Sequence, residues 1–512
     1  MISRLIADSG SAAVCRAAAR EYEGSVFYRG LHRLGLALGA GCRRSVILGI
    51  LLREGLFARA WRDSLTCRVL TFLLSLPGVL LHALYRAGKD KFDRSPLMAL
   101  AFDAGAGAAL AESWLILALW VIPFAQWDNA YHLMAFVLVY LLLCLRQMRN
   151  GVPLRLDRVG FYLPVMALAV ILSIPLSRYP ELSGRYLRYH IICMLCVLAT
   201  VSAPRGPGDL KRLAACGSTV ILVSAVWAVV QRIQGVEIVA AYVDKTMNAG
   251  MPGRVQSYFD NPNTYAQVLV MLLPLSLGLV AGGKRLSTRV FALVAFAAGV
   301  LALGMTYSRA SWIGLVLALA VFLMLWKPKL IPPLLVLVFL CIPLLPDTII
   351  NRILTIGQAS SDSTVTSRFP LYEAGWEIIR TRPLTGVGLG TDAVREYIID
   401  KRIYSMMVYY SHLHDIFIQL WAESGVLAVL GFTGAMLWGL KSMARETLRK
   451  GDKTVKCLAA ACCGSVCGSL LVGIVDYIWA YPRVMCIFWF VFALGLCCVR
   501  LLREGPAEEG SV

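Results

Sequence analysis

The chain is divided into long apolar blocks separated by short polar segments, and this pattern constrains its fold more than any other feature. Each block runs for about 17–25 residues, the length that an α-helix needs to cross about 30 Å of hydrocarbon. Charged residues make up only 16% of the 512 residues, against about a quarter in an average soluble protein. The sequence therefore predicts an all-α, polytopic membrane bundle in place of the several soluble domains that its length would allow.

We predict about twelve transmembrane helices within a domain that covers residues 96–504. Residues 1–95 form a separate basic region, and residues 505–512 a disordered tail. The longest connection, 347–414, is predicted to be an external loop that contains short helices. The predicted spans are 104–124, 129–145, 159–177, 187–203, 213–231, 264–281, 290–307, 311–326, 330–346, 415–440, 457–478 and 484–499.

The basic region mixes apolar side chains with arginines, which is typical of amphipathic helices that lie on an anionic leaflet. Ser45–Trp61 has this composition, and Val69–Tyr85 is nearly long enough to span. Because Pro77 and flanking charges interrupt that second stretch, we interpret it as an interfacial or re-entrant helix. The first twenty residues lack the apolar core of a signal peptide, so none is expected.

The net charge of +19 is concentrated in alternate loops between the apolar blocks. If the N-terminus is placed inside, most Lys and Arg fall in inside loops, as the positive-inside rule requires. We therefore predict a multi-pass protein of the cytoplasmic (inner) membrane with both termini cytoplasmic. Basic runs interleaved with aromatics are missing, so nucleic acid is not an expected partner, whereas membrane lipids are. Most of the 15 cysteines lie in apolar blocks, which predicts packing roles and argues against disulfides or zinc.

Two arginines fall at helix boundaries that this topology places on the external face. Arg254 precedes the turn Asp260-Asn261-Pro262-Asn263, where Asn263 is suited to cap the following helix. Arg309 lies in Tyr-Ser-Arg-Ala-Ser-Trp at the hinge between two spans, where a charge is costly unless it faces a cavity or a partner. A guanidinium group can hold a phosphate through paired hydrogen bonds, but Arg309 could equally pair with a carboxylate or a headgroup.

The external loop contributes a third motif, which begins with Arg368 and Trp376 in a predicted short helix. A glycine-rich piece, Pro383-Leu-Thr-Gly-Val-Gly-Leu-Gly390, follows it. This piece resembles a phosphate loop only weakly, because it follows no strand and lacks the characteristic lysine. We interpret it as a flexible turn next to the membrane.

The loop ends in Ser-His412-Leu-His414-Asp415, which holds two of the six histidines in the chain. Imidazole is the usual general base near neutral pH, so a catalytic role is one reading, and a helix cap or polar rim is another. A metal site is disfavoured, because helical residues two apart point to nearly opposite sides. Asp476, near an outer helix end, could pair with Arg483 or line the same cavity.

In this order the motifs resemble the O-antigen ligase and O-antigen polymerase superfamily. The shared pattern runs from an arginine before Asn-Pro-Asn, through Ser-Arg-x-x-Trp and a long loop, to a histidine followed after ten residues by Gly425. Relatives are metal-independent, cofactor-free membrane glycosyltransferases that transfer a glycan from undecaprenyl diphosphate to an acceptor hydroxyl. The acceptor can be a glycan, a lipid or a wall polymer.

The resemblance implies roles for individual residues. Arg254 and Arg309 would bind the donor diphosphate, and His414 would act as base on the acceptor hydroxyl or orient it. The remaining candidates are His412 behind His414, Arg368 and Trp376 in the loop that covers the site, and Asn263 and Asp415 as further binding residues. Many relatives have Asn where this chain has Asp415, and a carboxylate close to the imidazole would favour its protonated form.

Two alternatives to a ligase remain at this point. A repeat-unit polymerase uses the same donor and differs only in its acceptor. A transporter or flippase would be expected to show internal repeats and interrupted helices with charges at the midplane. The sequence shows no internal repeat, and its notable charges cluster at the predicted outer face.

Overall fold

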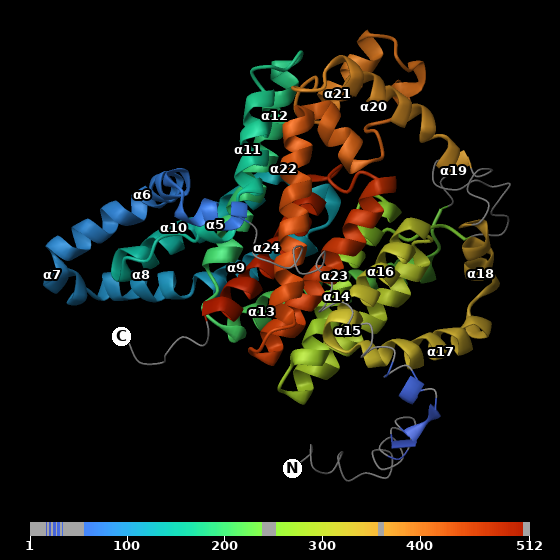
Figure 1. The fold of residues 1–512 in the computed structure, drawn as a ribbon, viewed down its shortest axis with the longest axis horizontal. Coiled ribbons are helices and arrows are strands. Elements are labelled where there is room, and N and C mark those ends of the chain that lie inside the picture. Colours follow the sequence, from blue (N-terminus) through green and yellow to red (C-terminus); the bar gives the residue numbers. More distant parts are fainter. Residues whose placement is uncertain are drawn as a thin grey trace.

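The computed structural model describes residues 56–237, 252–356 and 363–504, together with a few isolated positions between 17 and 33. Within these residues every regular element is a helix, so the predicted all-α membrane bundle is confirmed (Figure 1). Ser45–Trp61 lies largely outside the described residues, and the tail 505–512 lies wholly outside them.

Nine of the twelve predicted spans correspond to single helices that are long and apolar enough to cross a membrane. Apolar length alone was sufficient to locate them, because a helix satisfies the backbone hydrogen bonds of a chain in hydrocarbon; of the nine, α22 is interrupted at Gly425. These helices are α10 (Asn129–Asn150), α12 (Pro180–Ser202), α13 (Pro207–Gln234), α14 (Pro262–Gly282), α15 (Leu286–Met305), α16 (Arg309–Trp326), α22 (Ile416–Thr447), α23 (Lys453–Val475) and α24 (Pro482–Glu504).

The other three predicted spans are not single long helices. The first, 104–124, is part of a pair, α8 (Pro96–Ala106) and α9 (Ala108–Val121), which bends by 63° at Gly107. The spans at 159–177 and 330–346 contain only the short apolar helices α11 (Tyr162–Ser173) and α17 (Ile331–Cys341). The described residues hold ten helices of spanning length, or up to 11 if the bent pair counts as one span, which agrees with the predicted polytopic bundle.

The tenth helix of spanning length is α6 (Leu65–Ala87), which the sequence predicted to be interfacial or re-entrant. It packs along α10, where the Tyr140 hydroxyl donates to the Leu74 carbonyl at 2.7 Å and His82 Nδ1 lies 2.8 Å from the Met148 carbonyl. Figure 1 shows α6, α8 and α10 side by side, inclined away from the upright α12 and α22. By length and composition α6 is able to cross a bilayer, as α10 beside it is.

The centre of the bundle is formed by α14, α23 and α24, whose apolar windows are 89%, 72% and 94% buried. Gly464 and Gly468 of α23 let its backbone approach the Ala318 and Gly314 carbonyls of α16 closely. Small residues commonly mediate such contacts where lipid supplies no hydrophobic driving force between helices.

Arginines and acidic residues from distant segments meet at one end of the bundle. Arg155 pairs with Glu504, and Arg503 Nε lies 3.0 Å from Glu446. Arg146 donates to the Ala203 carbonyl at 2.8 Å. The ends of α10, α12, α22 and α24 that were predicted to lie inside therefore lie together.

The segment 347–414 contains short helices, as predicted. They are α18 (Asp347–Leu354), α19 (Ser363–Thr366), α20 (Phe369–Thr381), α21 (Thr391–Asp400) and η7 (Ser405–Tyr409). The remaining short helices are α5 (Leu56–Asp63), α7 (Lys89–Asp93), η1 (Phe124–Gln126), η2 (Leu156–Arg158), η4 (Pro328–Leu330) and η5 (Ile342–Leu344).

The glycine-rich piece of this segment is inserted into a break in α22. Gly425 has φ 78°, which interrupts the helix. The carbonyl groups that this interruption leaves without a helical partner accept hydrogen bonds from the loop. Val387 N donates to the Ala422 carbonyl at 2.9 Å, and Gly388 N donates to the Glu423 carbonyl at 3.0 Å. Val426 N completes the junction with the Pro383 carbonyl at 2.9 Å. Residues 383–388 are thus fixed to α22 by backbone hydrogen bonds, and we call this junction the splice. The sequence had suggested a flexible turn here.

We predict that Gly425→Ala lowers the thermal stability of the protein. A side chain here would adopt a left-handed conformation that costs about 1–3 kcal/mol, and its Cβ would meet the Leu384 carbonyl. Gly184→Ala in α12 is the matched control, because a Cβ there meets nothing within 4 Å. The measurement is the midpoint of heat-induced loss of the monodisperse peak in detergent. Equal midpoints for the two variants would contradict the splice.

Candidate active site

A cavity of about 940 Å³ lies at the end of the bundle opposite the clustered arginine–carboxylate pairs. Its walls come from the segment before α14, the first turn of α16, the end of α23 and the described parts of segment 347–414. Arg254, Arg309 and His414, which the sequence predicted to converge, all line it. Segments 200 residues apart in the chain thus contribute to one site.

Four arginines line the cavity, and each donates to a carbonyl at or just beyond the end of a helix. Arg254 Nε donates to the carbonyl of Thr306, directly after α15, at 2.7 Å. Arg309 Nη1 donates to Thr355, directly after α18, where its distance to the hydroxyl is 3.1 Å. Arg352 Nε lies 3.4 Å from the Tyr307 carbonyl, and Arg368 donates to the Val475 carbonyl, the last residue of α23. Helix C-termini carry partial negative charge, so these contacts stabilise the cations.

The arginines also influence one another. Burial, and then the charges of Arg352 and Arg309, lower the pKa of Arg254 to about 9. The group still carries its charge at neutral pH. Among the described lining residues Asp476 is the one carboxylate, so the cavity is strongly positive and suited to bind a phosphate or diphosphate.

His414 and Asp476 form a hydrogen-bonded pair in the wall of this cavity. His414 Nδ1 lies 3.0 Å from Asp476 Oδ1, and Asp476 also accepts from Gln267 Nε2 at 3.1 Å. Burial raises the pKa of Asp476, but the hydrogen bond and charge of His414 and the charge of Arg368 hold it well below its usual range. Since the ionised carboxylate accepts the Nδ1 proton, Nε2 of the neutral ring keeps its lone pair and can accept a proton.

His412 lies behind His414 and is buried. Its Nδ1 accepts the His414 backbone N–H at 3.2 Å, which assigns the ring proton to Nε2. Burial and the nearby His414 lower the pKa of His412 to about 3. His414 itself has φ 56°, an uncommon conformation for a residue other than glycine. His412 therefore serves here as a neutral acceptor that stabilises a strained turn.

Two sequence interpretations are corrected by this geometry. Asp415 does not lie against the imidazole: it caps α22, accepting from Phe417 N at 2.7 Å and Ile418 N at 2.8 Å, and it lies outside the cavity lining. The cap of α14 is Asn261, whose side chain accepts from Asn263 N. Asn263 is instead free to bond Arg254 from the cavity wall, because it lies one residue inside the helix.

Two further candidates lie away from the cavity. Trp376 is 46% exposed and packs on Trp421 at a ring distance of 6.1 Å, outside the lining. Arg483 does not pair with Asp476, since it donates to the Ile122 carbonyl and covers the Phe259 ring at 4.9 Å. Of the two roles open to Asp476, the structure therefore shows the lining role.

Sequence reasoning missed several lining residues. Arg352 lies in α18, where the pattern Asp-Thr-Ile-Ile-Asn-Arg-Ile-Leu signals only an amphipathic helix. The aromatic lining was missed as well, and it includes Tyr372 and Tyr410, which contact His414. Aromatic rings with a polar edge suit a ligand with both apolar and hydroxyl surfaces, such as a sugar.

His412, His414 and Asp476 each offer a ligand atom within 4.8 Å of the others, so they could hold a metal ion. The sequence disfavoured a metal site because residues two apart in a helix point to nearly opposite sides, but residues 411–415 are not helical. The Nδ1 atoms of both histidines already bond within the protein. A metal would therefore compete with the His414–Asp476 pair for the same atoms.

We predict that acid destabilises the protein through His412. Its pKa of about 3 in the folded protein lies below the value of about 6.5 expected when unfolded. The unfolded chain thus binds more protons between these values, and stability falls as pH falls from about 6.5, by at most about 1.4 kcal/mol per pH unit. His412→Gln, with midpoints measured from pH 8 to pH 5, should show a shallower decline than wild type. Asp476 contributes little there, because its stabilisation is lost only below its unfolded value of about 3.9.

Residues 291–433 match the model of the O-antigen ligase family, a range that includes Arg309, Arg352, Arg368 and His414. No curated protein matches the chain. The matched region joins α15 and α16 to the first half of α22, and so carries most of the cavity wall. The predicted resemblance is thereby confirmed over residues 291–433, which form an O-antigen ligase domain within a multi-pass membrane protein.

Proposed function

We propose that this membrane protein transfers a glycan from undecaprenyl diphosphate to an acceptor hydroxyl at the external face of the cytoplasmic membrane. The observation that carries the proposal is the hydrogen-bonded pair of His414 and Asp476 in the wall of a cavity lined by four arginines. A base and an anion site in one cavity are the two parts that this transfer needs. No cofactor enters the proposed reaction.

The arginines would bind the donor. A diphosphate that links a lipid to a sugar carries two negative charges, and Arg254, Arg309 and Arg352 lie together around the same part of the cavity. Each already has part of its guanidinium group fixed by a backbone carbonyl, so little ordering is required on binding. As the bond from sugar to diphosphate breaks, the same cations stabilise the charge that develops on the leaving diphosphate.

His414 would activate the acceptor. Its Nε2 accepts the hydroxyl proton while the hydroxyl oxygen attacks the anomeric carbon of the donor sugar. The new glycosidic bond forms, and undecaprenyl diphosphate leaves with the bonding electron pair. Asp476 stabilises the imidazolium that results and holds the ring in the required tautomer.

The orientation follows from the distribution of charge. The arginine-rich end of the bundle would face the cytoplasm, together with both termini, and the cavity would face outward. That side is where a lipid-linked glycan is available for surface polysaccharide assembly. Asn263 would support the proposed donor site through Arg254, whereas Asp415 and Trp376 would shape α22 and the loop without touching the substrate.

We predict that purified protein transfers a glycan from undecaprenyl diphosphate to an acceptor with EDTA present. His414→Ala should lower the rate about 10²–10⁴-fold, the range for loss of a general base. Asp476→Asn should also lower it, because the wrong ring nitrogen then carries the proton. Arg380→Ala is the matched control, since this side chain is 77% exposed and lies outside the cavity lining. Product is measured by mass spectrometry.

The outcomes separate the alternatives. Transfer onto a lipid-anchored sugar identifies a ligase, and extension of the donor glycan by itself identifies a polymerase. Loss of transfer in EDTA, restored by a divalent cation, would replace the base mechanism with metal assistance at His412, His414 and Asp476. Glycan flux into proteoliposomes without any transfer would overturn the proposal in favour of transport.

A second prediction concerns Arg352, which the motifs did not reveal. Because it contributes to the anion site and not to proton transfer, Arg352→Ala should raise KM for the lipid-linked donor while leaving KM for the acceptor unchanged. Arg352→Lys should restore charge but not the planar contact, and so recover only part of the loss. A change confined to the acceptor would contradict this assignment.

A further inference from the structure

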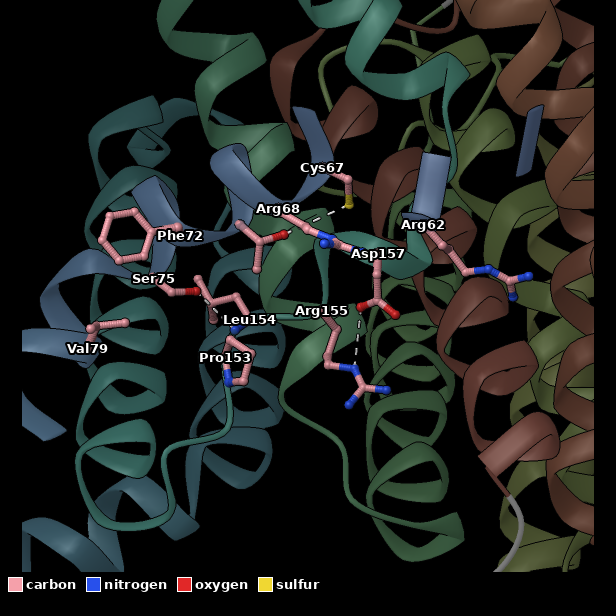
Figure 2. A pocket seen from close by; sticks show the side chains of 11 residues that line it. Arg62, Cys67, Arg68, Phe72, Ser75, Val79, Pro153, Leu154, Arg155 and Asp157 are labelled. Atoms are coloured by element: carbon pink, nitrogen blue, oxygen red, sulfur yellow. Dashed lines mark hydrogen bonds and ion pairs between the residues drawn. The ribbon is translucent and has the colours of Figure 1, made fainter. Parts of the chain in front are cut away.

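A second cavity, of about 460 Å³, lies far from the proposed active site (Figure 2). One wall is a face of α6, and the other is the chain segment that connects α10 to η2. This segment belongs to the arginine-rich end of the bundle. The O-antigen ligase domain at residues 291–433 contributes nothing to the lining.

The polar part of this second cavity is positively charged. Arg62, Arg68 and Arg155 line it, against one carboxylate, Asp157. That carboxylate is already engaged, because Arg158 Nε lies 2.6 Å from its Oδ2 and Arg155 Nε lies 3.6 Å from its Oδ1. The cavity therefore presents a net positive charge to any ligand that enters it.

The rest of the lining is apolar and extends along α6. Arg68, Phe72, Ser75 and Val79 recur at helical spacing on one face, opposite Leu154. Figure 2 shows Phe72 and Val79 to one side of the arginines, so the charged and apolar parts are separate. A ligand with a phosphate at one end and a hydrocarbon chain at the other matches this order.

The surroundings favour a lipid over a soluble ligand. Next to the lining, α6 exposes a series of large apolar side chains, and in a helix of this length and hydropathy such residues contact lipid. Those exposed by at least 39% are Leu65, Val69, Phe72, Leu73, Leu74, Leu80 and Leu84, of which Phe72 also belongs to the lining. The cavity thus lies beside a hydrocarbon-facing surface, where acyl chains are abundant.

We propose that this second cavity binds an anionic phospholipid, with the phosphate at Arg68 and Arg62 and an acyl chain along Phe72 and Val79. Basic pockets between membrane helices are suited to such headgroups. The bound lipid would connect α6 to the segment before η2, adding to the hydrogen bond from Leu154 N to Ser75 Oγ at 3.2 Å. A bound lipid would thereby help to hold the basic N-terminal region against the rest of the bundle.

The test is native mass spectrometry of the full chain in detergent, titrated with phosphatidylglycerol, phosphatidylcholine or inorganic phosphate. Arg68→Gln is the first variant, because Arg68 is exposed and Arg155 is already tied to Glu504. The matched control is Arg86→Gln, an exposed arginine at the other end of α6. Midpoints of heat-induced unfolding without lipid establish that the variants are folded.

We expect one tightly retained phosphatidylglycerol in wild type and in Arg86→Gln. In Arg68→Gln its Kd should rise about fivefold, and about 25-fold when Arg62→Gln is added, from about 1 kcal/mol per arginine. Equal retention of phosphatidylcholine, equal weakening in Arg86→Gln, or displacement of the lipid by millimolar phosphate would each overturn the proposal. These results are independent of glycan transfer, so either proposal can fail alone.

Discussion

The four arginines of the cavity depend on backbone carbonyls at the ends of helices. Arg254, Arg309 and Arg368 each donate to a residue at or directly after the last turn of α15, α18 or α23. A helix C-terminus supplies partial negative charge, so it stabilises a cation while neutralising it less than a full carboxylate would. These contacts join the ends of α15, α18 and α23 at the cavity wall.

The fold could be predicted where length and composition decide it. Nine apolar blocks form helices of spanning length because a helix bonds its backbone within the segment, as hydrocarbon requires. Composition gave no sign of the bend at Gly107. Next to the bend, α8 packs closely on α10, since a Cβ at Gly105 would meet the Arg146 backbone at 2.8 Å. The break at Gly425 was hidden for the same reason, since the residues bonded across it are 35 to 43 positions apart in sequence.

The site could be predicted in its charged residues but not in their pairing. Arg254, Arg309 and His414 stood out because charges and imidazoles are rare in this chain. The partner of His414 was left open, since Asp476 lies 62 residues away and only the fold selects it over Asp415. Trp376 had the right residue type in a motif, yet helical geometry turns it toward Trp421. Spacing along the chain therefore identifies candidate site residues, whereas tertiary contacts determine which of them line the cavity and which residues they pair with.

The splice of residues 383–388 into the break of α22 has a consequence for how such a protein can diversify. His414 stands two residues before α22, and the splice lies at residues 422–426 of the same helix, so the loop base and the imidazole form one stiff unit. Insertions near either junction would displace the imidazole. The exposed Tyr409, which lines the cavity and lies outside both junctions, has no such restriction. Sequence changes should therefore accumulate around Tyr409, while the junctions stay constant between lineages.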